Sequence, residues 1–204
     1  DGGAFLYRDG SMVSLGSIAA NANGSRNSAA TGINANGQIV GSSTVANDLD
    51  NGDDYVSSAF IYQNGTMTDL GHQGVNGRVF ANANAINNSG IVVGEHYDNN
   101  ANYFATRYQN GSWAALPTYR GDFSFADDIN ASGQIIGSDQ KFIFRIEADG
   151  SRTDLTPTIQ NGRYGHAAAI NDLGQGVGTL GTAWIDADGN HYEHAFLFDQ
   201  FGVH

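Results

Sequence analysis

Residues 33–41 read INANGQIVG, and this pattern decides the fold because it returns three more times. It reads INNSGIVVG from Ile86, INASGQIIG from Ile129 and INDLGQGVG from Ile170, so the starts lie 53, 43 and 41 residues apart. Asparagine can bond its own turn backbone, and glycine tolerates a positive φ. Each copy therefore predicts a hairpin with an Asn-x-x-Gly turn. The last glycine of each copy predicts a close approach by a neighbouring sheet.

A second pattern alternates with the first and consists of a short aromatic strand, a tight turn and another short strand. It reads AFLYRDGSMVSL from Ala4, AFIYQNGTMTDL from Ala59, ATRYQNGSWAAL from Ala105 and FIFRIEADGSRTDL from Phe142, and HAFLF begins it again at His194. Asp-Gly or Asn-Gly between alternating apolar residues predicts a type I′ hairpin. The aromatic strand thus begins five times, whereas the I-N-x-x-G hairpin occurs four times.

One unit of this repeat contains four strands, which predicts an all-β fold. We expect a single β-repeat domain over 1–204, with units near 29–70, 83–116, 125–155 and 166–198. The fourth unit is expected to lack its last strand. The N-terminal strands near 4–15 would either complete a blade or pair with another chain. Four antiparallel strands in about 40–50 residues are typical of a propeller blade, so we predict a small β-propeller of about four to five blades. A β-sandwich and an open β-solenoid are the alternatives.

The composition argues against several partners and sites. The formal net charge is −12 with only nine lysines and arginines, which disfavours nucleic acid and anionic membranes as partners. There is no cysteine, so disulfides and thiolate metal sites are excluded. No apolar run approaches the ~18 residues of a transmembrane helix, which predicts no membrane span. No signal peptide is present, and the start at Asp1 would suit a mature or trimmed chain.

The repeats resemble the HAF family of extracellular repeat proteins, named for a His-Ala-Phe that opens the aromatic strand. That triplet stands at residues 194–196, and Ala-Phe alone opens the strand at Ala4 and Ala59. Residues 64–71 (NGTMTDLG) and the I-N-x-x-G-Q-[IV]-V-G element complete the match, which covers nearly the whole chain. The third aromatic strand departs from it, with Ala-Thr-Arg-Tyr from Ala105. The resemblance implies secretion or surface display and a propeller-like fold, and it supplies no established reaction and no catalytic residues to transfer to this chain.

Variable connections are where we expect a ligand to bind. The turns after the first and third strands of each unit are short, whereas the connections 16–28, 44–56, 71–82, 97–102, 117–124, 156–165 and 186–190 vary. In a propeller these two classes lie on opposite faces, and binding residues usually lie on the longer loops. Histidine and tyrosine offer flat surfaces with polar edges, which suit sugars and peptides. The candidate ligand-binding residues are His72, Arg78, Tyr97, Tyr119, Arg120, Arg163, Tyr164 and His166. The plainer interpretation is that these side chains are ordinary exposed residues of hairpins.

One acidic stretch is a candidate calcium site. Residues 48–54 (DLDNGDD) supply four carboxylates, from Asp48, Asp50, Asp53 and Asp54. Calcium prefers several oxygen ligands on a flexible loop, but the spacing fails the EF-hand pattern because glycine stands where the third ligand belongs. A solvated acidic loop without a metal is the alternative. The expected cofactor is therefore none, or Ca²⁺.

Two classes of function are consistent with these features. The first is a non-catalytic extracellular or cell-surface module that binds a glycan or a surface protein. An unpaired edge strand could also join it into a homo-oligomer or filament. The second is a polysaccharide lyase with His72, His166, Tyr164 and Arg163 around the sugar, since histidine and tyrosine can transfer protons and arginine can neutralise a carboxylate. No catalytic motif assigns a reaction.

Overall fold

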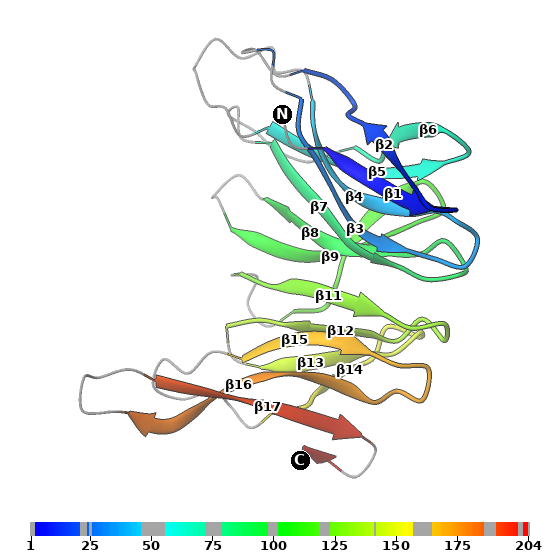
Figure 1. Cartoon of the computed structure of the whole chain (residues 1–204). Helices are drawn as coiled ribbons and strands as arrows, with labels where there is room; N and C mark the ends of the chain where they lie inside the picture. The colour runs from blue at the N-terminus through cyan, green and yellow to red at the C-terminus, as the bar shows by residue number, and fades with distance from the viewer. Residues whose placement is uncertain are drawn as a thin grey trace.

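The computed structural model describes residues 3–20, 24, 26–45, 56–71, 79–97, 102–118, 123–140, 142–156, 165–185, 191–199 and 202–203. Eighteen strands and no helix occur among these residues, as the all-β prediction requires. Figure 1 shows the strands as a series of small sheets that follow one another from the N-terminus to the C-terminus.

Four units of four antiparallel strands account for most of the described chain. The first contains β3 (Ser28–Ile33), β4 (Ile39–Thr44), β5 (Val56–Gln63) and β6 (Thr66–Asp69). The second contains β7 (Val79–Ile86), β8 (Val92–Tyr97), β9 (Tyr103–Gln109) and β10 (Ser112–Ala115). The third contains β11 (Phe125–Ile129), β12 (Ile135–Ser138), β13 (Ile143–Ile146) and β14 (Arg152–Asp154). The fourth contains β15 (Gly165–Ile170), β16 (Gly176–Ile185), β17 (His191–Asp199) and β18 (Gly202–Val203).

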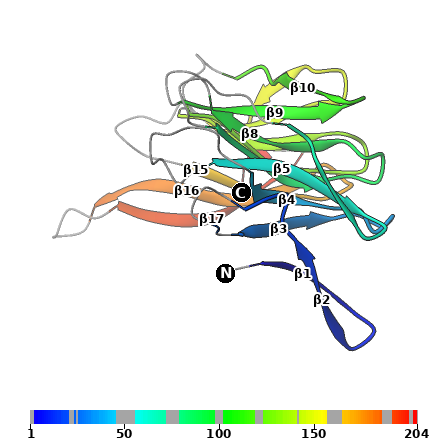
Figure 2. The same ribbon diagram turned by 90° about the horizontal axis from the view of Figure 1, so that it is seen from above.

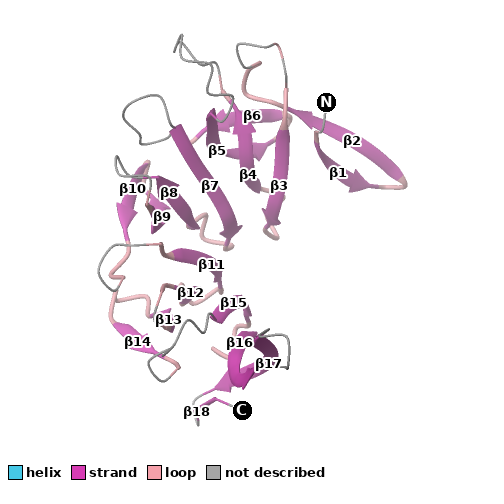
Figure 3. Cartoon of the chain, turned by 90° about the vertical axis from the view of Figure 1, so that its left-hand side faces the viewer, coloured by secondary structure: helices cyan, strands magenta, loops and turns pink. Residues whose placement is uncertain are grey.

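The units form a curved row whose two ends lie apart (Figure 3). A short parallel pairing of β5 with β7 joins the first two units into one sheet. The remaining strands, β1 (Ala4–Arg8) and β2 (Ser11–Gly16), pair with each other and with no other described strand. Seen from above, they extend away from β3 at the start of the row (Figure 2). The prediction that the fourth unit lacks its last strand is wrong, because the two-residue β18 pairs with β17.

The predicted hairpin chemistry is largely confirmed. In each Asn-x-x-Gly turn the glycine has a positive φ and its N–H donates to the asparagine carbonyl. Three of the tight turns have positive φ at both central residues, at Asp9-Gly10, Asn64-Gly65 and Asn110-Gly111, as type I′ requires. The fourth turn differs, because only Gly150 has a positive φ and the turn is closed by the Glu147 N–H donating to the Ser151 carbonyl. There Ser151 donates to the Asp149 carboxylate, which lowers the pKa of Asp149.

The last glycine of each repeat motif is required by a β-bulge. A Cβ on Gly41 would lie 1.9 Å from the carbonyl oxygen of Ala29, and one on Gly94 would lie 1.9 Å from that of Asn82. In each unit the first strand carries one extra residue beside this glycine, namely Thr31, Asn84, Asp127 or Ala168. The close approach therefore comes from the paired strand of the same hairpin and not, as predicted, from a neighbouring sheet.

Apolar side chains between consecutive units form the core. Val40 packs with Ile86 between the first two units, Val93 with Ile129 between the second and third, and Ile136 with Ile170 between the last two. The first residue of each pair comes from the second strand of one unit, and the second from the first strand of the next. The second and third units therefore each bury apolar side chains against both neighbouring units, as expected of a repeat array.

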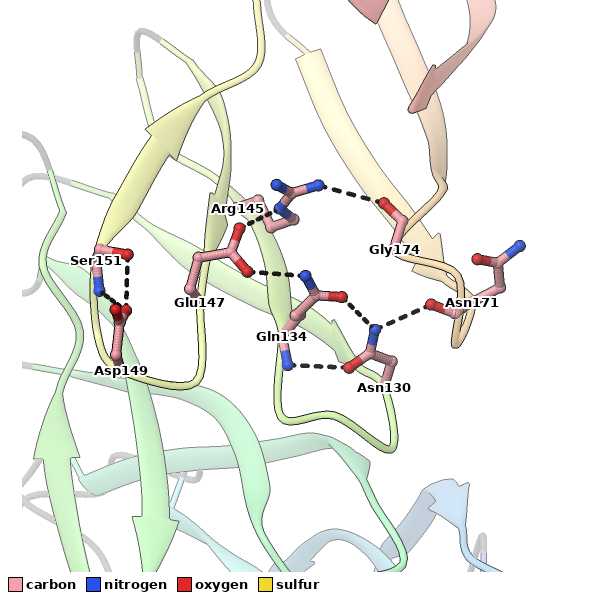
Figure 4. Close-up of polar contacts among 8 residues, drawn as sticks. All are labelled: Asn130, Gln134, Arg145, Glu147, Asp149, Ser151, Asn171 and Gly174. Atoms are coloured by element: carbon pink, nitrogen blue, oxygen red, sulfur yellow. Dashed lines mark hydrogen bonds and ion pairs between the residues drawn. The ribbon is translucent and has the colours of Figure 1, made fainter. Parts of the chain in front are cut away.

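An asparagine ladder crosses the same interfaces at the turns. We use this name for Asn34, Asn87, Asn130 and Asn171, the asparagines of the four I-N-x-x-G motifs. The Nδ2 of each of the first three donates to the backbone carbonyl of the next, at 2.9, 3.2 and 3.0 Å. Their side-chain oxygens accept backbone N–H groups of their own turns. Figure 4 shows the step from Asn130 to Asn171, beside an Arg145–Glu147 ion pair of 2.6 Å. The motif asparagine thus closes its turn and joins its unit to the next.

Candidate functional site: carboxylates and aromatic rings between the second and third units

One face of β8 changes from apolar to polar along the strand. Val93 lies in the apolar core against the third unit, and Glu95, two residues further on, is 6% exposed. Tyr97 follows at the end of the strand. Alternate residues of a strand share a face, so Glu95 and Tyr97 continue the surface that Val93 begins. This end of the sheets lies opposite the Asn-x-x-Gly turns, which gather on the right in Figure 1.

Glu95 is held by two asparagines of β7. Asn82 donates to one of its carboxylate oxygens at 2.8 Å, and Asn84 donates to the other at 2.6 Å. Asn84 is the bulge residue, and its Nδ2 also donates to the Ala126 carbonyl of the third unit at 3.0 Å. Burial raises the pKa of Glu95, and the bonds from Asn82 and Asn84 oppose that rise. A carboxyl held in this way can accept hydrogen bonds in a poorly hydrated place.

Asp127 brings a second carboxyl to the same place. It is the bulge residue of β11, and Ser138 lies 3.5 Å from its carboxylate. Burial is the largest cause that raises its pKa to about 7, followed by the nearby charge of Glu95; the Ser138 bond opposes the rise, and Asp128 adds to it. Two neighbouring carboxyls, one of which titrates near neutrality, are typical of functional sites and also occur in structural networks.

A group of aromatic rings lies near this pair, toward the strand ends. Tyr97 and Tyr103 contact each other with centroids 4.2 Å apart, and Phe80 lies 5.8 Å from both. Phe125 and Phe123 extend the group at 5.6 and 6.1 Å from Tyr103. Burial, then the hydrogen bond and charge of Tyr97 and the charge of Glu95, raise the pKa of Tyr103 to about 12. Its hydroxyl therefore stays protonated and can donate a hydrogen bond at any physiological pH.

Hydrogen bonds of Ser124 hold the chain beside Phe123, the most exposed ring of this group. The Ser124 N–H donates to the Tyr103 carbonyl at 2.9 Å, and the Ser124 hydroxyl accepts from the Ala105 N–H at 2.9 Å. Ser124 is fully buried, whereas Phe123 beside it is 41% exposed and has a φ of 46°. A positive φ is uncommon for a bulky residue, and strained residues gather at ligand sites. We call Phe80, Glu95, Tyr97, Tyr103, Phe123, Phe125 and Asp127 the acidic–aromatic cluster.

The carboxyls make stability depend on pH. The unfolded Asp127 carboxyl loses its proton near pH 3.8, whereas the folded one keeps it to about pH 7. Because the folded pKa is the higher one, stability should fall as the pH rises from about 4 to 7 and level off above. The loss is at most about 4.5 kcal/mol at ~1.4 kcal/mol per pKa unit. Glu95, whose pKa is also raised, adds a loss of the same sign.

Asp127→Asn is therefore expected to be more stable than the original chain at pH 8 and about equal to it at pH 4. Urea unfolding at a series of pH values would measure this. Asp9→Asn is the matched control, because Asp9 is a turn residue whose side chain is 88% exposed and whose only ion pair among the described residues is with the equally solvent-facing Arg8. Parallel pH profiles for Asp127→Asn and the original chain would contradict the raised pKa of Asp127.

The structure places only two of the ligand-binding residues predicted from the sequence. Tyr97 belongs to the acidic–aromatic cluster. His166 lies on β15 in the fourth unit and is exposed, so the structure does not bring it to that cluster. The others lie outside the described residues, namely His72, Arg78, Tyr119, Arg120, Arg163 and Tyr164.

The predicted calcium ligands are also undescribed, because Asp48, Asp50, Asp53 and Asp54 lie in the segment 46–55. In the part of the chain that the structure describes, no group of three or more histidines, aspartates or glutamates is arranged to hold a metal ion.

Sequence reasoning missed the two carboxyls, although one signal was present. The residue after the last motif glycine is Ser42, Ser138 or Thr179 in three units and Glu95 in the second. A glutamate in a chain with only three of them, at a position that is otherwise a small hydroxyl residue, marks the second unit as different. No such signal marked Asp127, because its place beside Glu95 depends on how the second and third units pack against each other.

No described helix has the length and apolar character needed to cross a membrane. No protein-family model matches the chain, and no curated protein is similar enough to count as a relative.

Proposed function

We propose that this protein is a non-catalytic extracellular or cell-surface binding module, built as a propeller-like array of blades of the HAF type. Its ligand would be a glycan or a surface protein, and the acidic–aromatic cluster would bind it. The observation that carries the proposal is the combination of a partly exposed aromatic group with two carboxyls beside it.

The chemistry of the cluster favours a neutral or cationic sugar. Aromatic rings stack on the apolar faces of sugars, and carboxylates and tyrosine hydroxyls bond their hydroxyl groups. The net charge of −12 and the paired carboxyls of Glu95 and Asp127 would repel an acidic glycan. The cluster lies at the ends of β8 and β9, beside the variable connection between them, where binding residues are usually found.

Removing an aromatic ring should weaken ligand binding without unfolding the protein. Tyr103→Ala is expected to lower affinity for the best ligand on a glycan array about tenfold or more, because the ring and its hydroxyl are both removed and an aromatic ring stacked on a nucleic-acid base is worth about 1–3 kcal/mol. Tyr192→Ala is the matched control, since Tyr192 is 48% exposed and lies on β17, away from the cluster. Equal binding by both variants, or no glycan binding at all, would count against this site.

A second candidate function is glycan cleavage, which the raised pKa of Asp127 favours. A carboxyl that titrates near pH 7 beside a second carboxyl can serve as a general acid or base. The lyase with His72, His166, Tyr164 and Arg163 remains the form predicted from the sequence. Product formation from array-positive glycans, lost in Asp127→Asn, would replace the binding proposal with an enzymatic one.

Self-assembly is the further part of the proposal. β1 pairs only with β2 among the described strands, so its other edge is unpaired. An unpaired edge can accept a strand from another chain. The proposed result is a homo-oligomer or filament on the cell surface.

A further inference from the structure

The first residue of the repeat motif differs in burial at the start of the row. The first residue of the I-N-x-x-G motif is 7% exposed at Ile86, 6% at Ile129 and 7% at Ile170, but 58% at Ile33. The three buried residues contact the preceding unit. We call the side of β3 that carries Ile33 the leading face.

The opposite side of the last unit shows the reverse pattern. The residue before the last motif glycine is fully buried at Val40, Val93 and Ile136, where the following unit covers it, but Val177 is 44% exposed. We call the side of β16 that carries Val177 the trailing face. Ile33 and Val177 are thus the two halves of an apolar contact that the chain makes three times internally.

The asparagine ladder is also incomplete at both ends of the row, and the two ends are complementary. Within the described residues, no side chain donates to the carbonyl of Asn34, which is the acceptor position of the asparagine ladder at the leading face. At the other end, Asn171 Nδ2 donates to Gln175 of its own turn and reaches no carbonyl of a following unit. The ladder therefore has an open acceptor at the leading face and an open donor at the trailing face.

The hairpin β1–β2 corresponds to the outer half of a unit. In three complete units the phenylalanine of the third strand pairs with the last motif glycine, as Phe60 with Gly41, Phe144 with Gly137 and Phe196 with Gly178. These rings are 0, 0 and 7% exposed, but Phe5, in the same position of β1, is 53% exposed. No described strand lies along this edge of β1. A cavity of about 210 Å³ lies there between β1 and β3, lined by Phe5, Tyr7, Ala30 and Ile33 among others.

We propose that this place binds the hairpin β15–β16 of a second copy of the chain, so that copies join head to tail. Val177 would cover Ile33 of the next copy, Gly178 would lie under Phe5, and Asn171 would donate to the Asn34 carbonyl. The inference rests on the self-assembly part of the proposed function and names the two surfaces that make the contact. A head-to-tail contact uses different surfaces on each copy, so it produces a ring or an open filament.

The contact requires an exchange of equivalent strands. β17 occupies the place beside β16 within one copy, and its residues 195–199 (AFLFD) correspond to residues 4–8 (AFLYR) of β1. β1 of the next copy would therefore replace β17 with the same pairing. Thr179, which pairs with Ala195 inside one copy, would face Ala4 of the next.

Sedimentation velocity over a concentration series tests the two surfaces. The original chain should associate, and more strongly at high salt, because copies of net charge −12 repel each other. Ile33→Asp and Val177→Asp should each weaken self-association about tenfold or more, because the contact would bury an unpaired carboxylate. A mixture of the two variants should form a heterodimer and nothing longer, since each keeps the surface that the other has lost. Ala114→Asp is the control, because Ala114 is exposed on β10 of the second unit and lies at neither end of the row.

A crosslinking experiment tests the exchange of strands. The chain has no cysteine, so only the introduced cysteines can react with a thiol crosslinker. An Ala4→Cys variant mixed with a Thr179→Cys variant should give a covalent heterodimer with a short thiol crosslinker. The double variant Ala195→Cys with Thr179→Cys is the control and should crosslink within one copy.

The outcomes separate this inference from the proposal on which it rests. Association that neither Ile33→Asp nor Val177→Asp weakens would overturn the inference and leave self-assembly standing. A monomer at every concentration and salt would overturn both. Association lost in each variant and restored only in their mixture, with the Ala4–Thr179 crosslink, would support both.

Discussion

Replacing Asn130 with alanine is expected to lower the free energy of unfolding by about 2–3 kcal/mol, because three side-chain hydrogen bonds of about 1 kcal/mol each are lost. Its side chain accepts from the Gln134 N–H at 2.9 Å and donates to Gln134 Oε1 at 2.7 Å and to the Asn171 carbonyl at 3.0 Å. Asn130 is 3% exposed, so water cannot readily replace these partners. Urea or thermal unfolding would measure the loss.

Asn171→Ala provides the matched control. Asn171 holds its own turn through Leu173, Gln175 N–H and Gln175 Oε1, but it joins no following unit and it is exposed. We expect Asn171→Ala to cost about 1 kcal/mol or less, since solvent can satisfy the released groups. Equal losses in the two variants would show that the bond between units adds nothing to the turn.

Gly94→Ala is expected to destabilise the protein by about 3 kcal/mol or more, because its new methyl group would collide with backbone that is held in place. The added Cβ would lie 1.9 Å from the Asn82 carbonyl oxygen, and the Cα of Ala83 is 3.1 Å away. The β-bulge at Asn84 would have to open, which would also displace the two asparagines that hold Glu95. Chemical unfolding would measure the effect.

Gly111→Ala separates this collision from conformational strain. Gly111 has a φ of 82° in a tight turn, and a Cβ there would meet nothing within 4 Å. Its cost is therefore the left-handed conformation alone, about 1–2 kcal/mol. If Gly94→Ala cost no more than Gly111→Ala, the close approach in the hairpin would not be the reason for the motif glycine.

The hairpins could be predicted from the sequence because their causes are local. Asn-x-x-Gly and Asn-Gly specify turns through residues a few positions apart, and the alternation beside them specifies strands. The turn at Asp149-Gly150 is the exception, since the same dipeptide also fits a longer turn in which only the glycine has a positive φ. The bulges had no signal of their own beyond the glycine that accommodates them.

The candidate site could be predicted only in part, because it lies between units. Tyr97 was found from its place beside a variable connection, but Glu95 and Asp127 meet only when β8 packs against β11. Contacts between units depend on packing over more than thirty residues of sequence separation, which no local pattern encodes. The same holds for Ile33 and Val177, whose exposure follows from their place at the ends of the row.

The asparagine ladder also has a consequence for how the length of such a chain can change. Each motif asparagine supplies a side-chain donor for the next unit and a backbone acceptor for the previous one. Every unit therefore contains the groups needed to bond a unit on either side. A tandem duplication of one unit would insert a segment that already fits its neighbours, and a deletion would rejoin matching surfaces. Since stability in such arrays adds up from neighbouring contacts, the number of units can drift between related genes while each joint stays the same.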